Sequence, residues 1–186
     1  MCSPPSSSSD EDLSVGSLLW HLLREVVETV IPAIVIAIFI TLFLAQATQV
    51  YGQSMEPNLY AGQRLIVEKI SYHLHPPQRG DIVVLRLPEQ GRSFLIKRVV
   101  GLAGETIEVH DQHVFIDGYP LTECYLDQPL RGSIPPRHIP KGHVFVLGDN
   151  RGFSNDSRSF GPVPVSNVIG RAWIRYWPPN RVGLVH

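Results

Sequence analysis

A long apolar run near the N-terminus is the first feature of the hydrophobic pattern. No charged residue occurs between Thr29 and Met55, and residues 30–45 are apolar except for one proline and one threonine. With a few flanking residues, the run reaches the roughly 20 residues that a helix needs to cross a bilayer core. It shows no polar face, which a buried helix of a soluble protein normally has. The pattern predicts a transmembrane anchor over residues 25–48.

A cleaved secretory signal is the alternative interpretation of this run, because Ala45-Gln46-Ala47 has the small-x-small form of a cleavage site. The preceding residues argue against it, since a signal peptide opens with a short positive segment, whereas this chain opens with a Ser/Pro-rich acidic one. We expect residues 1–24 to be a disordered tail. Flanking charge does not orient the anchor, because Arg24 and Arg64 balance each other.

Beyond the anchor the pattern alternates with period two and is rich in β-branched residues, with Gly, Pro or Asp between the segments. Residues 49–186 are therefore predicted to form one mainly β domain. Asp117-Gly118 and residues 110–112 have the composition of hairpin turns, and the Pro-rich residues 129–142 are predicted to form a long irregular connection. The predicted strands cover residues 64–70, 81–87, 93–100, 105–109, 113–117, 143–148 and 170–177.

Composition excludes several function classes. The formal net charge is −1 and there is no Lys/Arg run, so nothing indicates nucleic acid as a partner. The two cysteines, Cys2 and Cys124, lie in unrelated contexts, and we expect neither a disulfide nor a zinc site. His73 and His75 form a pair without further ligands at metal-binding spacing. No metal and no cofactor are expected.

Two stretches carry candidate chemistry. In GQSMEP, residues 52–57, a glycine and a proline bracket Ser54, as in a turn that presents a hydroxyl. Lys97 lies in an otherwise apolar strand. It either extends its amine to solvent or holds it in a low-dielectric site, where a neutral amine can take a proton from a serine.

A third stretch, LGDNRGFSNDSRSFG at residues 147–161, is the densest polar segment of the chain. Its Asp and Arg residues are compatible with a loop held by ion pairs, and such a loop is compatible with a catalytic role. Asn155-Asp156-Ser157 also matches the acceptor motif for N-glycosylation, which is a short and unspecific pattern.

Taken together, the anchor and these stretches resemble type I signal peptidases, membrane-anchored serine proteases that remove signal peptides. The resemblance covers residues 25–181 through SMEPNL, RLIVEK, KRVVGLAGE and GDNRGFSNDSRSFGPV, in the family's order. It implies a signal-peptidase-like β catalytic domain with Ser54 as nucleophile and Lys97 as general base. The turn that carries Ser54 would then lie close to the membrane surface, just after the anchor.

The resemblance also assigns supporting roles. Ser154 would orient Lys97, and Gly148 would be the small residue packed beside the lysine. Some members carry a serine at the position of Gly52, so the oxyanion hole here would rest on the backbone N–H groups of Ser54 and Gly52. We accordingly expect Gly52→Ser to be tolerated or mildly activating. Two ion pairs would hold the polar loop against the lysine strand: Asp149 with Arg98 and Asp156 with Arg158.

The implied activity is a membrane-bound endopeptidase that cuts preproteins after Ala-x-Ala-like sites, with the signal peptide as substrate and the lipid bilayer as surroundings. The β domain would lie on the trans side of a bacterial plasma membrane or a thylakoid-type membrane. Contact with the export machinery is not readable from the residues. Two alternatives remain open at this point: a self-cleaving repressor-like Ser/Lys protease and an inactive membrane-tethered β binding module.

Overall fold

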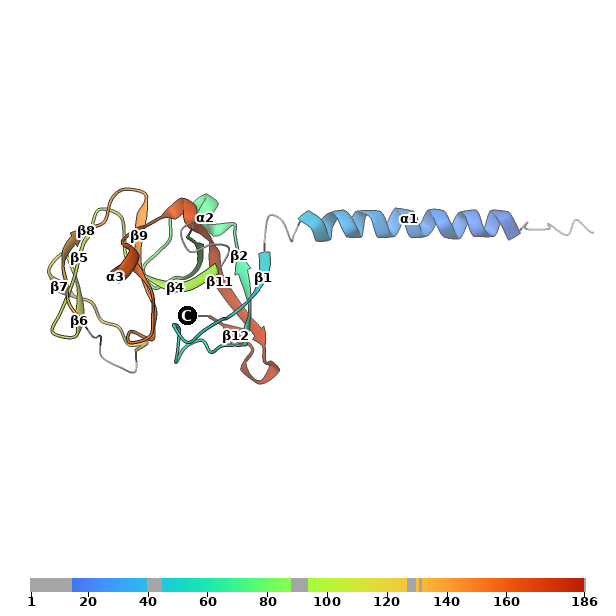
Figure 1. The fold of residues 1–186 in the computed structure, drawn as a ribbon. Helices are drawn as coiled ribbons and strands as arrows, with labels where there is room; N and C mark the ends of the chain where they lie inside the picture. The colour runs from blue at the N-terminus through green and yellow to red at the C-terminus, as the bar shows by residue number, and fades with distance from the viewer. Residues whose placement is uncertain (1–14, 40–44, 88–93, 127–129, 131, 186) are drawn as a thin grey trace, which may run out of the picture. The chain divides into compact units, whose positions relative to one another are not determined.

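The computed structural model describes residues 15–39, 45–87, 94–126, 130 and 132–185. The chain divides into two units, residues 1–41 and 42–186. The described part of the first unit is helix α1, and the second unit contains the described strands (Figure 1).

Helix α1 covers Val15–Phe39. Arg24 pairs with Glu28 one turn later, at 2.7 Å, on its exposed surface. The predicted tail was therefore too long, because residues 15–24 are helical. The leucine-rich sequence of this stretch favours helix, and no proline interrupts it before Pro32. Within the described ranges, no helix combines the length and the apolar character that crossing a membrane requires.

The C-terminal part of the predicted anchor differs from the structure. Ala45–Gln49 forms strand β1, which pairs antiparallel with β2, Arg64–Glu68, so the β domain begins before residue 49. Polar Gln46 and Thr48 alternate with small residues in this segment, and β2 pairs with it along one side. Residues 1–14 of the predicted tail and 40–44 of the predicted anchor lie outside the described residues.

The larger antiparallel sheet has the order β1-β2-β11-β3-β4-β9-β10, with β12 also paired to β11. Strand β4, which carries Lys97, has β3 and β9 as neighbours, and β11 shifts register against both β2 and β3. The predicted strands of this sheet are confirmed to within two residues at each end. The remaining bounds are β3 Ile82–Arg86, β4 Phe94–Gly101, β9 His143–Leu147, β10 Val163–Pro164, β11 Val168–Trp177 and β12 Gly183–Leu184.

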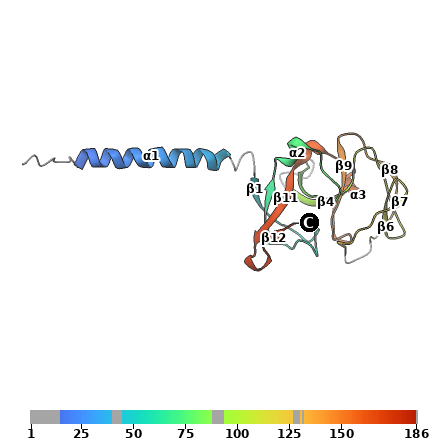
Figure 2. The ribbon, with the colours of Figure 1, turned by 180° about the vertical axis from the view of Figure 1, so that it is seen from behind.

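A second sheet, with the order β7-β6-β5-β8, gathers at one end of the β domain in both views (Figure 1 and Figure 2). The predicted hairpin turns are present: Asp117 and Gly118 have φ of 50° and 80° between β6 and β7. The predicted irregular connection was wrong in part, because it contains β8. The two prolines of β8 are tolerated because β8 is an edge strand, which pairs on one side only. The bounds are β5 Thr106–His110, β6 His113–Ile116, β7 Tyr119–Pro120 and β8 Ile134–His138.

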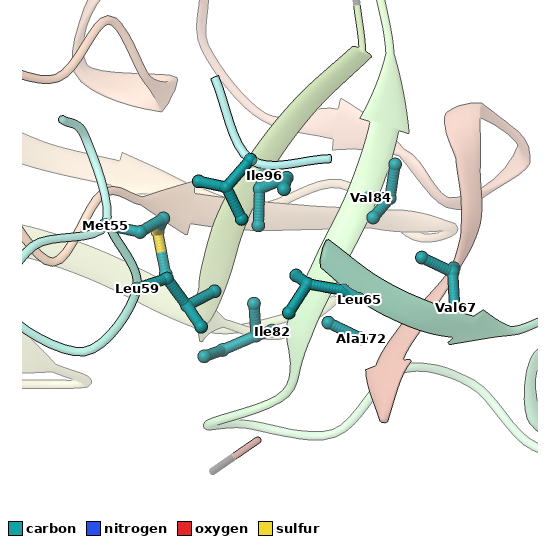
Figure 3. Close-up of a cluster of buried hydrophobic side chains, with 9 residues drawn as sticks. Met55, Leu59, Leu65, Val67, Ile82, Val84, Ile96 and Ala172 are labelled. Carbon is teal, nitrogen blue, oxygen red and sulfur yellow. The ribbon is translucent and has the colours of Figure 1, made fainter. Parts of the chain in front are cut away.

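One buried cluster connects the larger sheet to the turn that follows β1. Met55 and Leu59, both 1% exposed, pack among apolar side chains of β2, β3, β4 and β11 (Figure 3). This burial fixes the turn on the sheet. The short helical segments are α2 Ser71–Leu74, α3 Ser157–Phe160, η3 Val165–Asn167 and η4 Pro179–Arg181.

Candidate active site

Ser54 lies on the turn between β1 and β2, directly before the buried Met55. Val50 and Gln63 close the base of this loop through the Val50 N–H, which donates to the Gln63 carbonyl at 2.8 Å. Met55 is held in the core (Figure 3), and this burial restricts the backbone of the neighbouring Ser54.

Lys97 lies in the middle of β4 with only 2% of its surface exposed. The sequence allowed the Lys97 amine either to reach solvent or to lie in a low-dielectric site, and the structure has it buried. Its Nζ lies 2.7 Å from Oγ of Ser54. A charged amine donates a hydrogen bond to this hydroxyl, whereas a neutral amine accepts one from it. The separation is short enough for proton transfer between the two groups.

Burial lowers the pKa of Lys97 from 10.5 to about 8, because the charged amine loses its hydration. The carboxylates of Asp156 and Asp149 raise this pKa, and the guanidinium of Arg158 lowers it. The effect of burial exceeds the net effect of these charges. Near pH 8 the amine is therefore divided between its charged and neutral forms.

The polar loop that follows β9 holds the Ser54 turn in place. The Asn150 N–H donates to the Ser54 carbonyl at 3.0 Å. A Cβ on Gly148 would lie 2.5 Å from that carbonyl oxygen and 2.2 Å from Oγ of Ser154, distances that real Cβ atoms essentially never show. Glycine is thus required at residue 148 by close approach of the loop to the turn.

Both predicted ion pairs are present. Arg98 donates to Asp149 from Nε and from a terminal nitrogen, at 2.8 and 2.7 Å, and both side chains are buried. Arg158 makes a similar two-point contact with Asp156, at 2.8 and 2.9 Å. These fork geometries are the strong form of carboxylate pairing.

Asp156 has a second function as the N-cap of α3. Burial acts to raise its pKa, but hydrogen bonds from Arg158 and from the Gly148 N–H outweigh burial and hold the pKa below its usual range. The Ser154 hydroxyl also favours the ionised carboxylate, although it has no partner at hydrogen-bond geometry. Ser154 therefore does not bond to Lys97 in this structure, where the amine is directed to Ser54, and its orienting role stays a prediction.

Gly52 has a φ of +78°, which glycine adopts readily and other residues rarely. A Cβ there would meet no atom within 4 Å, so the constraint is the backbone and not space. Gly52→Ser would therefore place an L residue in the left-handed region at a cost in stability, and the expected tolerance of the substitution in activity stays a prediction.

Comparison with known proteins identifies the family. The family described as signal peptidase, peptidase S26, matches residues 23–177. A probable signal peptidase I-1 of Synechocystis is 42% identical over 172 residues, covering 88% of this chain and 87% of the relative. A signal peptidase I of Leptolyngbya laminosa is 45% identical and covers 87% and 83%, respectively. The chain belongs to the signal peptidase family.

A thylakoidal processing peptidase of Arabidopsis thaliana is also similar, at 40% identity over 75% of this chain and 44% of the relative. Membership of the signal peptidase family makes the chain a peptidase, so the repressor-like protease and the inactive binding module are set aside. The relatives include both bacterial and thylakoidal enzymes.

Three residues that hold the surroundings of Ser54 and Lys97 were not among the sequence-predicted site residues: Asn58, Glu123 and Tyr125. Asn58 donates to both Asp149 and the Tyr125 carbonyl, and the Tyr125 ring lies 4.0 Å from the guanidinium carbon of Arg98. Glu123 forms a buried ion pair with Arg151 of the polar loop. Glu123 and Tyr125 come from a segment without a catalytic signature, so no sequence signal connects them with the site.

Proposed function

We propose that Ser54 and Lys97 form a catalytic dyad in which Ser54 attacks the scissile carbonyl of a preprotein. The observation that carries the proposal is the 2.7 Å separation of Lys97 Nζ from Ser54 Oγ, with the lysine buried. A neutral Lys97 removes the hydroxyl proton as the new C–O bond forms, and the resulting ammonium returns that proton to the leaving amine. Water then hydrolyses the acyl-enzyme, with Lys97 again accepting a proton.

The backbone N–H groups of Ser54 and Gly52 are proposed to stabilise the oxyanion of the tetrahedral intermediate. Rigidity of this turn supports the assignment, since Met55 is buried and the Ser54 carbonyl is held by Asn150. Preorganised donors cost no rearrangement when the charge develops.

The substrate is proposed to bind as an added strand along β4, with small side chains preceding the cleaved bond in an Ala-x-Ala-like pattern. Pairing of β4 with β9 covers only Arg98–Gly101, so among the described strands the edge of residues 94–97 is unpaired on that side. This edge ends at Lys97, which would bring the scissile bond to the dyad.

We further propose that the apolar run anchors the enzyme in a membrane by a single pass, with the β domain on the trans side, in a bacterial plasma membrane or a thylakoid-type membrane. Support comes from the absence of charge between Thr29 and Met55 and from the bacterial and thylakoidal relatives. Trp173 and Trp177 are about half exposed on β11 and are candidates for contact with the lipid headgroups.

The test is cleavage of a purified preprotein by the detergent-solubilised full chain and by Ser54→Ala. The variant should lose at least about a thousandfold in kcat, because no other group supplies the attacking oxygen. Ser166→Ala, which truncates an exposed serine on η3, is the matched control and should retain activity. Sequencing of the new N-terminus gives the cleavage site. A Ser54→Ala enzyme that cuts at the same bond would refute the dyad.

A further inference from the structure

Asn58 lies four residues after Ser54 on the same turn, and its side chain reaches two distant parts of the β domain. Its Nδ2 donates to Oδ2 of Asp149 at 2.8 Å and to the backbone carbonyl of Tyr125 at 2.9 Å. These partners are 91 and 67 residues away in sequence. One amide thus connects the Ser54 turn, the polar loop and the segment that follows β7.

Both of these partners are themselves held firmly. The Asp149 carboxylate is fully buried and accepts two hydrogen bonds from Arg98. The Tyr125 ring stacks over the same guanidinium, and its hydroxyl donates to Glu123. A tether to these groups restricts the turn more than a contact with a mobile surface side chain would.

Two consecutive residues of the polar loop hold the two ends of the short stretch from Ser54 to Asn58. The Asn150 N–H bonds the Ser54 carbonyl, and the Asp149 carboxylate accepts from the Asn58 amide. Between these two points Met55 is anchored in the core. Small rotations of the turn, which would move Ser54 Oγ away from Lys97, are therefore opposed at three places.

We propose that Asn58 is a positioning residue that holds Ser54 at reacting distance from Lys97. It touches neither the substrate nor the reacting atoms in this assignment. The proposal rests on the proposed dyad, and it predicts a loss in kcat with little change in KM, because the β4 edge that would bind substrate is not altered. A misplacement of about 1 Å at a reacting centre costs on the order of a hundredfold in rate.

The first variant is Asn58→Leu, which removes both donors and adds no charge. We expect kcat to fall about ten- to hundredfold with KM within about threefold of wild type. Asn167→Leu, the same substitution at a partly buried asparagine on η3, is the control and should keep its activity. Rates are expressed per folded enzyme. A kcat within twofold of wild type, or a loss confined to KM, would overturn the proposal.

The second variant, Asn58→Asp, is close in shape and keeps the proposal testable if Asn58→Leu fails to fold. It removes the donors and places a second carboxylate beside Asp149. The charged groups that influence Lys97 are Asp156, Arg158 and Asp149, with Arg98 paired to Asp149. An added negative charge should lower kcat and move the acid limb of kcat/KM upward by roughly half to one pH unit. A wild-type kcat and an unchanged profile contradict the positioning role.

Ser54→Ala is measured in the same assay to separate the two hypotheses. An inactive Ser54→Ala with a fully active Asn58→Leu removes only the role of Asn58. An active Ser54→Ala variant would contradict the dyad, and with it the assignment of Asn58 as a residue that positions Ser54. An inactive Ser54→Ala variant together with a selective kcat loss in both Asn58 variants supports the dyad and the role of Asn58.

Discussion

Two buried cations are consecutive residues of β4, and their surroundings differ in kind. Arg98 has a buried carboxylate partner in a two-point contact and an aromatic ring stacked on its guanidinium. Lys97 has a neutral hydroxyl as its closest partner, and the carboxylates that influence it are each bound to an arginine. The same strand therefore carries one compensated charge and one charge that burial disfavours.

This difference separates a cation held in an ion pair from the cation that is proposed to act as a base. The buried Arg98, with its matched carboxylate, fixes the loop after β9 against β4. The buried Lys97, whose hydrogen-bond partner is the neutral Ser54 hydroxyl, gives up its proton more easily, as its lowered pKa of about 8 indicates. Substitutions of Lys97 and of Arg98 should therefore have separable effects, on activity for the lysine and on stability for the arginine.

The largest expected effect is that of Lys97→Arg on activity. A guanidinium does not deprotonate at usable pH, so the variant cannot act as base and should lose at least about a thousandfold in kcat/KM. Its melting temperature, compared with that of wild type, tests whether the fold survives. An arginine variant that keeps the wild-type acid limb would rule out Lys97 as the base.

The next effect is on stability and comes from Arg98→Met. This change leaves the Asp149 carboxylate buried without its ion-pair partner and should cost about 3–5 kcal/mol of unfolding free energy. Adding Asp149→Asn should recover much of this loss, because no buried charge is then left uncompensated. Urea unfolding of the full chain in detergent measures both. An Arg98→Met variant as stable as wild type would show that the ion pair between Arg98 and Asp149 contributes little to stability.

The pH dependence sharpens the comparison for Lys97. The proposed dyad requires the neutral amine, so kcat/KM should rise about tenfold per pH unit below pH 8 and level off above it. The folded pKa lies below the unfolded value of about 10.4, so burial of Lys97 destabilises the fold most below pH 8, by about 3 kcal/mol, and this cost disappears as pH rises through the unfolded pKa. The unfolding free energy of Lys97→Met minus that of wild type should therefore shrink between pH 8 and 10.4. A difference that stays constant over this range would contradict a pKa of Lys97 that burial lowers.

The smallest effect is expected for Gly52→Ser, which touches neither cation. The positive φ of Gly52 should cost the serine variant about 1 kcal/mol of stability, while open space around the new Cβ avoids a clash. The new hydroxyl would lie beside the proposed oxyanion donors, at a position where some family members carry a serine, so kcat should change by less than about threefold. Thermal unfolding and steady-state kinetics test the two parts separately, and a hundredfold fall in kcat in a folded protein would contradict this account of the turn.

The sequence located most strands of the β domain because alternation of β-branched and polar residues is a local property. It failed for β1, which was assigned to the anchor, and for β8, which contains two prolines. Both segments become strands through pairing with a partner, β2 or β5, that is distant in sequence. Local propensity does not include that partner.

Within the site, the sequence supplied the identity of the chemical groups, and its resemblance to signal peptidases supplied the expected roles of Ser54, Lys97 and the two ion pairs. The contacts of Asn58 with Asp149 and Tyr125, and of Glu123 with Arg151, come from segments 28 to 91 residues apart. No periodicity or spacing encodes such contacts.

The sequence by itself thus determined that the chain has an apolar N-terminal run, a mainly β domain, and a serine turn, a lysine strand and a polar loop that resemble those of signal peptidases. Only the tertiary structure decided that Lys97 is buried and faces Ser54 at 2.7 Å, while Arg98, one residue later, is neutralised by Asp149. The physical reason is that the pKa and the role of a cation depend on its burial and nearest charges, and folding assembles these from strands and loops far apart in the chain.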